Sequence, residues 1–411
     1  MLLKRYGRVF LCCMLVWQSG TLAACGSLNN VADGRMETQE KLKDAGMEDE
    51  STEDAGGASK EPVVLEEEGG GAAAGNEEGR EAADAKLRFG KDCIAEQTFE
   101  VSLSEYEESV WFVPCAPSDG SSFHMQIISG EDVLLDISGY VPETLSDASF
   151  SSLDAVSFYD VNYDGNTDIV LIETYGSAAF AAVYYGYPQN GDGEGGFFIQ
   201  ETLSEALSAQ TDDLTIPQIR SLLSDGKKNG AFSDYREAYE MVSRLCALES
   251  GGEMKYDLIS FDADAIPELV AGVNGYFMSL YAFSDGTVHT LMDRWPYGAM
   301  GNAGYAYCPG KNSLKNENSD FAGAILYTTY LTSGSGHALE EVAQIQTYQF
   351  DDANQNGVPD ENEQDSIGRY SVSYLDGRGI TEEERASYDA GEYVYLEGRL
   401  DAEELKAELN R

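Results

Sequence analysis

The segment 26–85 restricts where this chain can fold. It carries 17 acidic and 5 basic residues, includes the runs GGASK and EEEGGGAAAGNEEG, and has no apolar periodicity. A segment of this composition cannot bury enough apolar surface to offset the entropy that it would lose on ordering. We therefore predict a disordered acidic tether over residues 25–85 and a folded part that is confined to residues 86–411.

The residues after the tether have the pattern of antiparallel sheet. Short runs rich in β-branched and aromatic residues alternate with Gly, Asn, Asp and Ser, as in strands joined by tight turns. Strands are predicted at 98–103, 109–114, 123–129, 132–136, 155–160, 168–173, 179–186, 256–261, 268–273, 276–283, 288–292, 324–331, 342–350 and 369–375. Short helices are expected at 202–209 and after the capping residues Thr215, Asp234, Thr381 and Asp401.

These segments predict an α+β fold of two β-rich, mainly antiparallel modules with short helices. The sequence GKKNG at 226–230 marks a boundary, because glycines and polar residues interrupt regular structure. The modules are therefore expected at 86–226 and 230–411. A chain of 411 residues has room for about two domains, each with a core of its own.

The N-terminus has the pattern of an export signal. The basic stretch KRYGR at 4–8 precedes nine apolar residues at 9–17, which is shorter than the roughly 20 residues that a membrane span needs. LAAC at 22–25 then resembles a bacterial lipobox, whose cysteine becomes the first mature residue and carries acyl chains such as palmitate. We predict a lipoprotein signal peptide over 1–24 and an extracytoplasmic protein anchored to the bacterial cell membrane through Cys25. The alternative is an ordinary cleaved signal.

The charge of the chain excludes some classes of partner. The sequence has 26 Lys and Arg against 73 Asp and Glu, a formal net charge of −47. A field this negative repels phosphate groups. We therefore expect no nucleic-acid partner.

The segment VSFYDVNYDGNTDIVLI at 156–172 contains the sharpest candidate metal site. Oxygen-bearing side chains at positions 1, 3, 5 and 9 and a glycine at position 6 match the first nine positions of a calcium loop,. The predicted ligands are Asp160, Asn162, Asp164, Asn166 through its carbonyl group, and Asp168. Position 12 is Leu171, so the bidentate glutamate of an EF-hand is missing. The alternative is a polar hairpin turn, which uses the same residue types.

A second calcium-type loop has the full twelve-position pattern, including the terminal glutamate. Its predicted ligands are Asp352, Asn354, Asn356, the carbonyl group of Val358, Asp360 and Glu363. Two of these ligands are neutral amides, which lowers the negative charge and the expected affinity. A polar hairpin loop is again the alternative.

A third stretch, at 260–268, has the same register but a weaker pattern. Ser260 replaces the first carboxylate and Ala265 replaces the turn glycine, while Asp262, Asp264 and Glu268 remain. We interpret this stretch as a loop between strands that has lost its ion.

These motifs carry a family resemblance. Segment 156–172 resembles the D-x-[DN]-x-D-G-x-x-D repeats of FG-GAP/VCBS surface proteins. YDLISFDADAIPELVAGVNGYFMSLYAFSDGTVHTLM at 256–292 and GNAGYAYCPGKN at 301–312 resemble a module of clostridial lipoproteins with a D-x-D-G-x-P-E-L motif. The resemblance covers about residues 88–375 and implies a cell-surface address and calcium as the cofactor. A complete propeller is not expected, because the two motifs lie about 100 residues apart.

Four cysteines follow Cys25, an even number that permits two disulfides in an exported chain. One sequence leaves three pairings open. We favour Cys93–Cys115 and Cys246–Cys308, since each bond then stays within one module. The alternative is buried free thiols.

No catalytic motif is found in the sequence, and 73 acidic residues make any single carboxylate pair uninformative. We therefore expect a surface protein, stabilised by Ca²⁺, that binds an extracellular ligand, either a glycan or a protein, or serves in adhesion. The alternative is a surface hydrolase that acts on polysaccharide or peptide through carboxylates.

Overall fold

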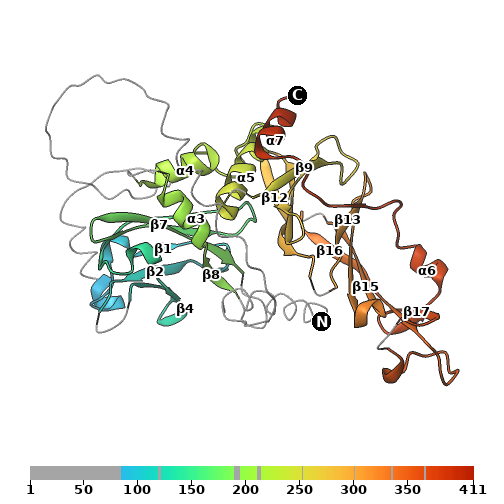
Figure 1. Ribbon diagram of the computed structural model, residues 1–411. Helices are drawn as coiled ribbons and strands as arrows, with labels where there is room; N and C mark the ends of the chain where they lie inside the picture. Colours follow the sequence, from blue (N-terminus) through green and yellow to red (C-terminus); the bar gives the residue numbers. More distant parts are fainter. Residues whose placement is uncertain are drawn as a thin grey trace, which may run out of the picture. The chain divides into compact units, whose positions relative to one another are not determined.

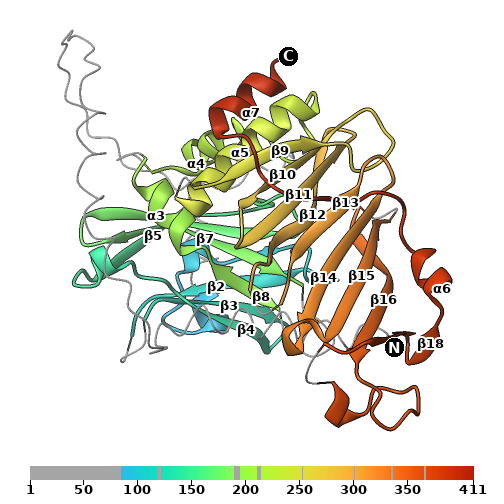
Figure 2. The same cartoon turned by 45° about the vertical axis from the view of Figure 1, so that its right-hand side comes forward.

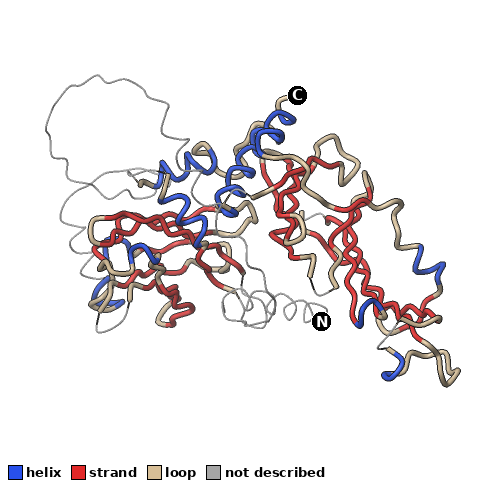
Figure 3. Tube along the Cα trace, viewed as in Figure 1, coloured by secondary structure: helices blue, strands red, loops and turns tan. Residues whose placement is uncertain are grey.

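The computed structural model describes residues 85–118, 122–188, 195–210, 214–251, 253–299, 301–334, 337–364 and 367–411 (Figure 1). The predicted signal peptide, Cys25 and the tether up to residue 84 lie outside the described residues. Strands dominate the rest, and the helices are few and short (Figure 3). All sheets are antiparallel, and no sheet of the described residues closes into a barrel. The predicted β-rich antiparallel class is confirmed.

The first two sheets are four-stranded, with their strands in chain order. The first contains β1 (Phe99–Val101), β2 (Val110–Cys115), β3 (His124–Ser129) and β4 (Asp132–Ser138), and the second contains β5 (Phe150–Tyr159), β6 (Asp168–Tyr175), β7 (Ala178–Tyr187) and β8 (Gly196–Ile199). Short 3₁₀ turns, η1 (Ala95–Gln97) and η2 (Glu143–Leu145), precede β1 and β5. The middle of β6, from Ile169 to Ile172, is apolar on both faces because both faces are covered,. Ile169 and Leu171 pack against the first sheet, whereas Val170 and Ile172 pack against helices.

Those helices are α3 (Glu201–Ser208), α4 (Ile216–Ser224), α5 (Tyr235–Ser250) and the C-terminal α7 (Ala402–Leu409) (Figure 1). Local capping explains where three of them begin, as the sequence predicted. Thr215 accepts the N–H of Gln218, and Asp234 accepts the N–H groups of Arg236 and Glu237. Asp401 forms a capping box. None of the helices in the described residues is long and apolar enough to cross a membrane.

The third sheet repeats the layout of the second. It contains β9 (Lys255–Ile259), β10 (Glu268–Val273), β11 (Phe277–Ser284) and β12 (Thr287–Pro296), again in chain order. Leu269 and Ala271 of β10 belong to the same apolar cluster as α5, while Val270 points to the other face. The cluster around α5 includes buried residues from Val161 to Leu409, so it combines side chains from both sides of the predicted boundary at 226–230.

The last sheet has seven strands (Figure 2). They are β13 (Gly304–Cys308), β14 (Ser313–Asp320), β15 (Ile325–Ser333), β16 (Leu339–Phe350), β17 (Tyr370–Leu375), β18 (Arg378–Ile380) and β19 (Val394–Tyr395), accompanied by η3 (Phe321–Gly323), η4 (Glu361–Glu363) and α6 (Glu382–Ala386). Tyr305, Tyr307 and Leu314 at one end of this sheet pack against Val270 and Leu280 of the third sheet.

Candidate metal-binding loops

The loop 160–168 joins β5 to β6, whose residues Tyr159 and Asp168 pair across the ladder. Its tight turn depends on two residues with positive φ, Tyr163 at 64° and Gly165 at 86°. Asp160 accepts the N–H of Asp164 at 3.1 Å and the N–H of Gly165 at 3.3 Å. The chain therefore wraps around the first predicted ligand.

The other polar side chains of this loop also turn inward. Asn162 Oδ1 accepts the N–H of Asp164 at 3.3 Å, and Asn162 Nδ2 donates to Asp164 Oδ2 at 3.1 Å. Asp164 Oδ1 accepts the N–H of Asn166 at 2.8 Å. Asp160, Asn162 and Asp164 are thus linked in one network of hydrogen bonds. The predicted ligand group of Asn166 is its backbone carbonyl.

Asp168 is the most deeply buried member of the set, with 0% of its surface exposed. Its two oxygens accept the N–H groups of Val161 at 2.6 Å and of Gly186 at 2.9 Å. The bond with Val161 closes the loop, and the bond with Gly186 attaches it to β7. Each carboxylate oxygen has a further lone pair that could bind a cation. In the structure, however, both oxygens of Asp168 accept backbone hydrogen bonds.

Burial raises the pKa values of the loop carboxyl groups. The pKa of Asp160 rises to about 6, chiefly because burial disfavours its charged form. The pKa values of Asp164 and Asp168 are raised for the same reason, and the charged neighbours that act on Asp168 are Asp164 and Asp160. A divalent cation at this position would remove that mutual repulsion.

Residues outside the motif hold the loop in place, and sequence reasoning did not identify them. Asn229 Nδ2 donates to Asp160 Oδ2 at 3.2 Å and to the carbonyl group of Val288 at 2.9 Å. Thr290 of β12 donates from its N–H and hydroxyl groups to the carbonyl of Tyr163. Single polar residues in distant segments carry no pattern that would point to this loop.

Glu105 approaches the same loop from the segment between β1 and β2. Its Oε1 accepts the N–H of Thr167 at 2.9 Å. Its Oε2 is buried and has no hydrogen-bond partner in the described part of the chain. Burial raises the pKa of Glu105, and the charge of Asp164 raises it further. Glu105 therefore adds a further carboxyl group beside the predicted ligands.

The second predicted loop, between β16 and β17, has the same internal scheme. Asp352 accepts the N–H groups of Asn356 and Gly357, each at 2.9 Å. Asn354 Oδ1 accepts the same N–H of Asn356 at 3.0 Å. These bonds occupy the positions of the Asp160 and Asn162 bonds in the first loop.

The end of the second loop closes through similar bonds, with Glu363 in the role that Asp168 has in the first loop. Asn356 Oδ1 accepts the N–H of Val358 at 2.8 Å, and Asn356 Nδ2 donates to Asp360 at 3.0 Å. Glu363 accepts the N–H of Ala353 at 2.9 Å and that of Asp360 at 3.3 Å. Asn354 also donates to Asp360, so three of the predicted side-chain ligands are linked directly. Val358, whose carbonyl was the remaining predicted ligand, is 49% exposed.

The third stretch also gathers its acids, although the sequence favoured a loop without an ion. One oxygen from each of Asp262, Asp264 and Glu268 lies within 4.8 Å of the others. Glu268 accepts the N–H of Phe261 at 2.7 Å, as Asp168 accepts that of Val161. Burial raises the pKa of Glu268 to about 7. Ile259 pairs with Glu268, so this loop and the loop 160–168 occupy equivalent places in two similar sheets.

The four cysteines after Cys25 are free and buried. Cys93 and Cys115 face each other in an isolated antiparallel bridge. Cys246 of α5 lies 3.6 Å from the hydroxyl of Tyr281. Cys308 ends β13, where its sulfur lies close to Gly391. Cys93 and Cys115 are therefore brought together, whereas Cys246 and Cys308 have different neighbours.

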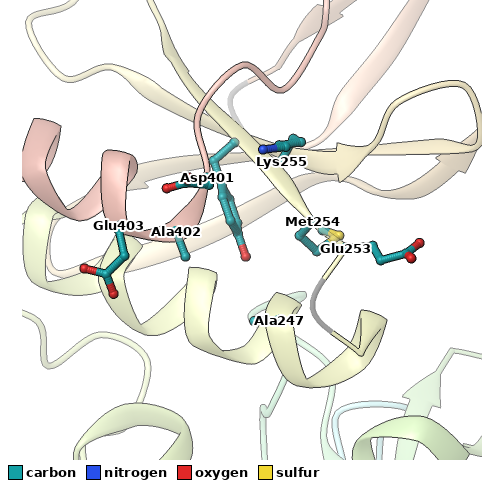
Figure 4. Close-up of a pocket in the computed structure, with 8 residues that line it drawn as sticks. Ala247, Glu253, Met254, Lys255, Asp401, Ala402 and Glu403 are labelled. Atoms are coloured by element: carbon teal, nitrogen blue, oxygen red, sulfur yellow. The ribbon is translucent and has the colours of Figure 1, made fainter. Parts of the chain in front are cut away.

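Two features bear on the hydrolase alternative. Ser284 Oγ lies 3.0 Å from His289 Nε2, and the ring of His289 stacks on that of His337 at 3.9 Å. A hollow beside α5, β9 and α7 is lined by Glu253, Asp401 and Glu403 among others. In Figure 4 the carboxyl groups of Glu253 and Glu403 point to opposite sides, and Asp401 caps α7. The hollow therefore lacks the convergent carboxylates that glycoside hydrolysis needs.

No family model matches this chain, and no curated protein matches it.

Proposed function

We propose that this chain is a lipid-anchored, extracytoplasmic surface protein whose β-rich part is stabilised by Ca²⁺ and binds an extracellular ligand. The export signal and lipobox sequence support the anchor at Cys25. The acidic composition of 25–85 supports a tether that holds the folded part away from the membrane. In this proposal the two modules, 86–226 and 230–411, each contain β-sheets and one or more calcium-type loops. They do not form a complete propeller.

The observation that carries the calcium proposal is the network of hydrogen bonds that links Asp160, Asn162 and Asp164 within the loop 160–168. Ca²⁺ prefers six to eight oxygen ligands in flexible geometry. Asp160, Asn162, Asp164, the carbonyl of Asn166 and Asp168 would supply most of these. Asp352, Asn354, Asn356, the carbonyl of Val358, Asp360 and Glu363 would form a second, more exposed site.

The test is the melting temperature of the protein with Cys25→Ser, with and without millimolar Ca²⁺. An ion that binds only the folded state at 100 times its Kd adds about 2.7 kcal/mol to the unfolding free energy. Asp160→Ala/Asp164→Ala should abolish most of this gain. Glu143→Ala/Asp147→Ala is the control, because it removes the same charge from residues that are exposed. This variant should keep the gain in unfolding free energy that Ca²⁺ gives. An unchanged melting temperature in Ca²⁺ would refute the calcium proposal, and unchanged membrane fractionation of Cys25→Ala would refute the anchor.

A further inference from the structure

One face of the seven-stranded sheet has an unusual composition. The strand register places Asn318, Tyr327, Gln346 and Tyr374 in one row across β14, β15, β16 and β17. β14, β15 and β16 lie side by side in Figure 2, and β17 pairs with β16. The flanking rows on the same face are Asn316, Thr329 and Gln344, and Asp320, Ile325, Tyr348 and Val372. We call these three rows the tyrosine–amide face.

The two faces of this sheet are covered differently. On the opposite face, Tyr330 and Ile345 form an apolar cluster with Tyr388 and Tyr393 of the C-terminal segment. On the tyrosine–amide face, Tyr327, Tyr348 and Tyr374 are half-buried and belong to none of the apolar clusters of the described residues. These tyrosines are therefore not part of a core.

Lateral contacts hold the side chains of this face in position. The rings of Tyr348 and Tyr374 meet edge to face at 5.8 Å. The hydroxyl of Tyr327 hydrogen-bonds with Gln346 and Asp320. Gln344 donates to Thr329 at 3.4 Å. A surface whose side chains are already ordered loses less entropy when it binds a ligand.

The tyrosine–amide face carries little charge. Across the three rows, Asp320 is the one charged side chain among the described residues, whereas 24% of the whole chain is charged. An anionic ligand would meet no base here and would be repelled by the net charge of −47,. A cationic ligand would find a single carboxylate. The face is therefore complementary to an uncharged ligand.

We propose that the tyrosine–amide face binds a strand of uncharged polysaccharide. Tyrosine rings offer apolar faces for the C–H groups of sugars, and amides and hydroxyls both donate to and accept from sugar hydroxyls. Four strands at their usual spacing make this surface about 14 Å wide, enough for several sugar rings. The proposal rests on the proposed function only in assuming an extracellular ligand, and it does not involve the metal-binding loops.

The test is retardation of the Cys25→Ser protein in native gels that contain hydroxyethyl cellulose, laminarin or dextran, with anionic alginate as the control polymer. At least one neutral polymer should slow the protein, and alginate should not. Tyr348→Ala should weaken the binding about tenfold, as expected for the loss of one aromatic contact and its buried area. Ser371→Ala, an exposed position in β17 on the opposite face, should leave the binding unchanged.

A second variant distinguishes loss of binding from loss of folding. Gln346→Glu keeps the size of the side chain and adds a charge, so it should weaken binding without changing the melting temperature. Failure of all three neutral polymers to bind, or binding that survives both Tyr348→Ala and Gln346→Glu, would overturn the proposal. The effect of Ca²⁺ on the melting temperature is measured separately, so loss of the calcium proposal and loss of the polysaccharide proposal are distinguishable.

Discussion

Glu173 is a fully buried carboxyl group on β6, and its Oε2 accepts the hydroxyl of Tyr175 at 2.7 Å. Its Oε1 has no hydrogen-bond partner in the described residues. Burial raises the pKa of Glu173 from 4.5 to about 7. A raised acid pKa means that the folded state holds the proton more tightly, so its stabilising effect is present below pH 4.5 and is lost as the pH rises to about 7.

We therefore predict that Glu173→Gln is close to neutral at pH 4.5 and stabilising at pH 8, by about 3 kcal/mol relative to the original chain. Urea unfolding at the two pH values measures this difference. Other buried acids such as Glu268 titrate equally in both proteins, so the comparison isolates Glu173. A difference that does not depend on pH would contradict the assignment.

The pair Cys93 and Cys115 yields a second prediction at the residue scale. The N–H of Ile94 bonds to the carbonyl of Pro114, and the N–H of Ala116 bonds to that of Asp92, so the cysteines form a non-hydrogen-bonded pair with Cα atoms about 4.5 Å apart. This spacing suits a disulfide. We expect protein from an oxidising compartment to contain this bond, worth about 3 kcal/mol. Peptide mapping without reductant tests it, and two alkylated thiols at 93 and 115 would disprove it.

At the scale of elements, the loop 160–168 depends on a residue that lies outside it. Asn229 bonds to Asp160 and makes two bonds with the backbone of Val288. Asn229→Ala removes the partner of the Asp160 carboxylate and of the Val288 N–H group. We therefore expect a loss of about 2 kcal/mol in unfolding free energy. Urea denaturation measures it, with Lys228→Ala, an exposed neighbour, as the matched control. Equal stability of the two variants would show that Asn229 does not hold the loop.

At the scale of the whole molecule, the apolar cluster around α5 joins residues from Val161 to Leu409. We therefore expect residues 150–300 and α7 to unfold in one transition. Leu405 of α7 is 1% exposed, so Leu405→Ala should cost about 3 kcal/mol and shift that transition as a unit. Leu134→Ala, at a position that is 40% exposed, is the control. A separate early transition in calorimetry that is confined to the C-terminal helix would contradict a shared core.

Local patterns in the sequence were enough for the β-rich antiparallel class, for β10 at 268–273 and for the caps at Thr215, Asp234 and Asp401. Each of these depends on side chains that lie a few residues apart. The backbone of the loop 160–168 is held partly in the same way, since Asp160, Asn162 and Asp164 accept N–H groups of the same loop.

Only the tertiary structure decided the rest. β14 has the sequence SLKNENSD and was not predicted, because its polar side chains carry no strand pattern. It is a strand because β13 and β15 pair with it on both sides. The contact of Asn229 with Asp160 and the shared core likewise join distant segments. Non-local pairing supplies the hydrogen bonds and burial that these residues lack on their own, so their structure depends on neighbours that the local sequence does not contain.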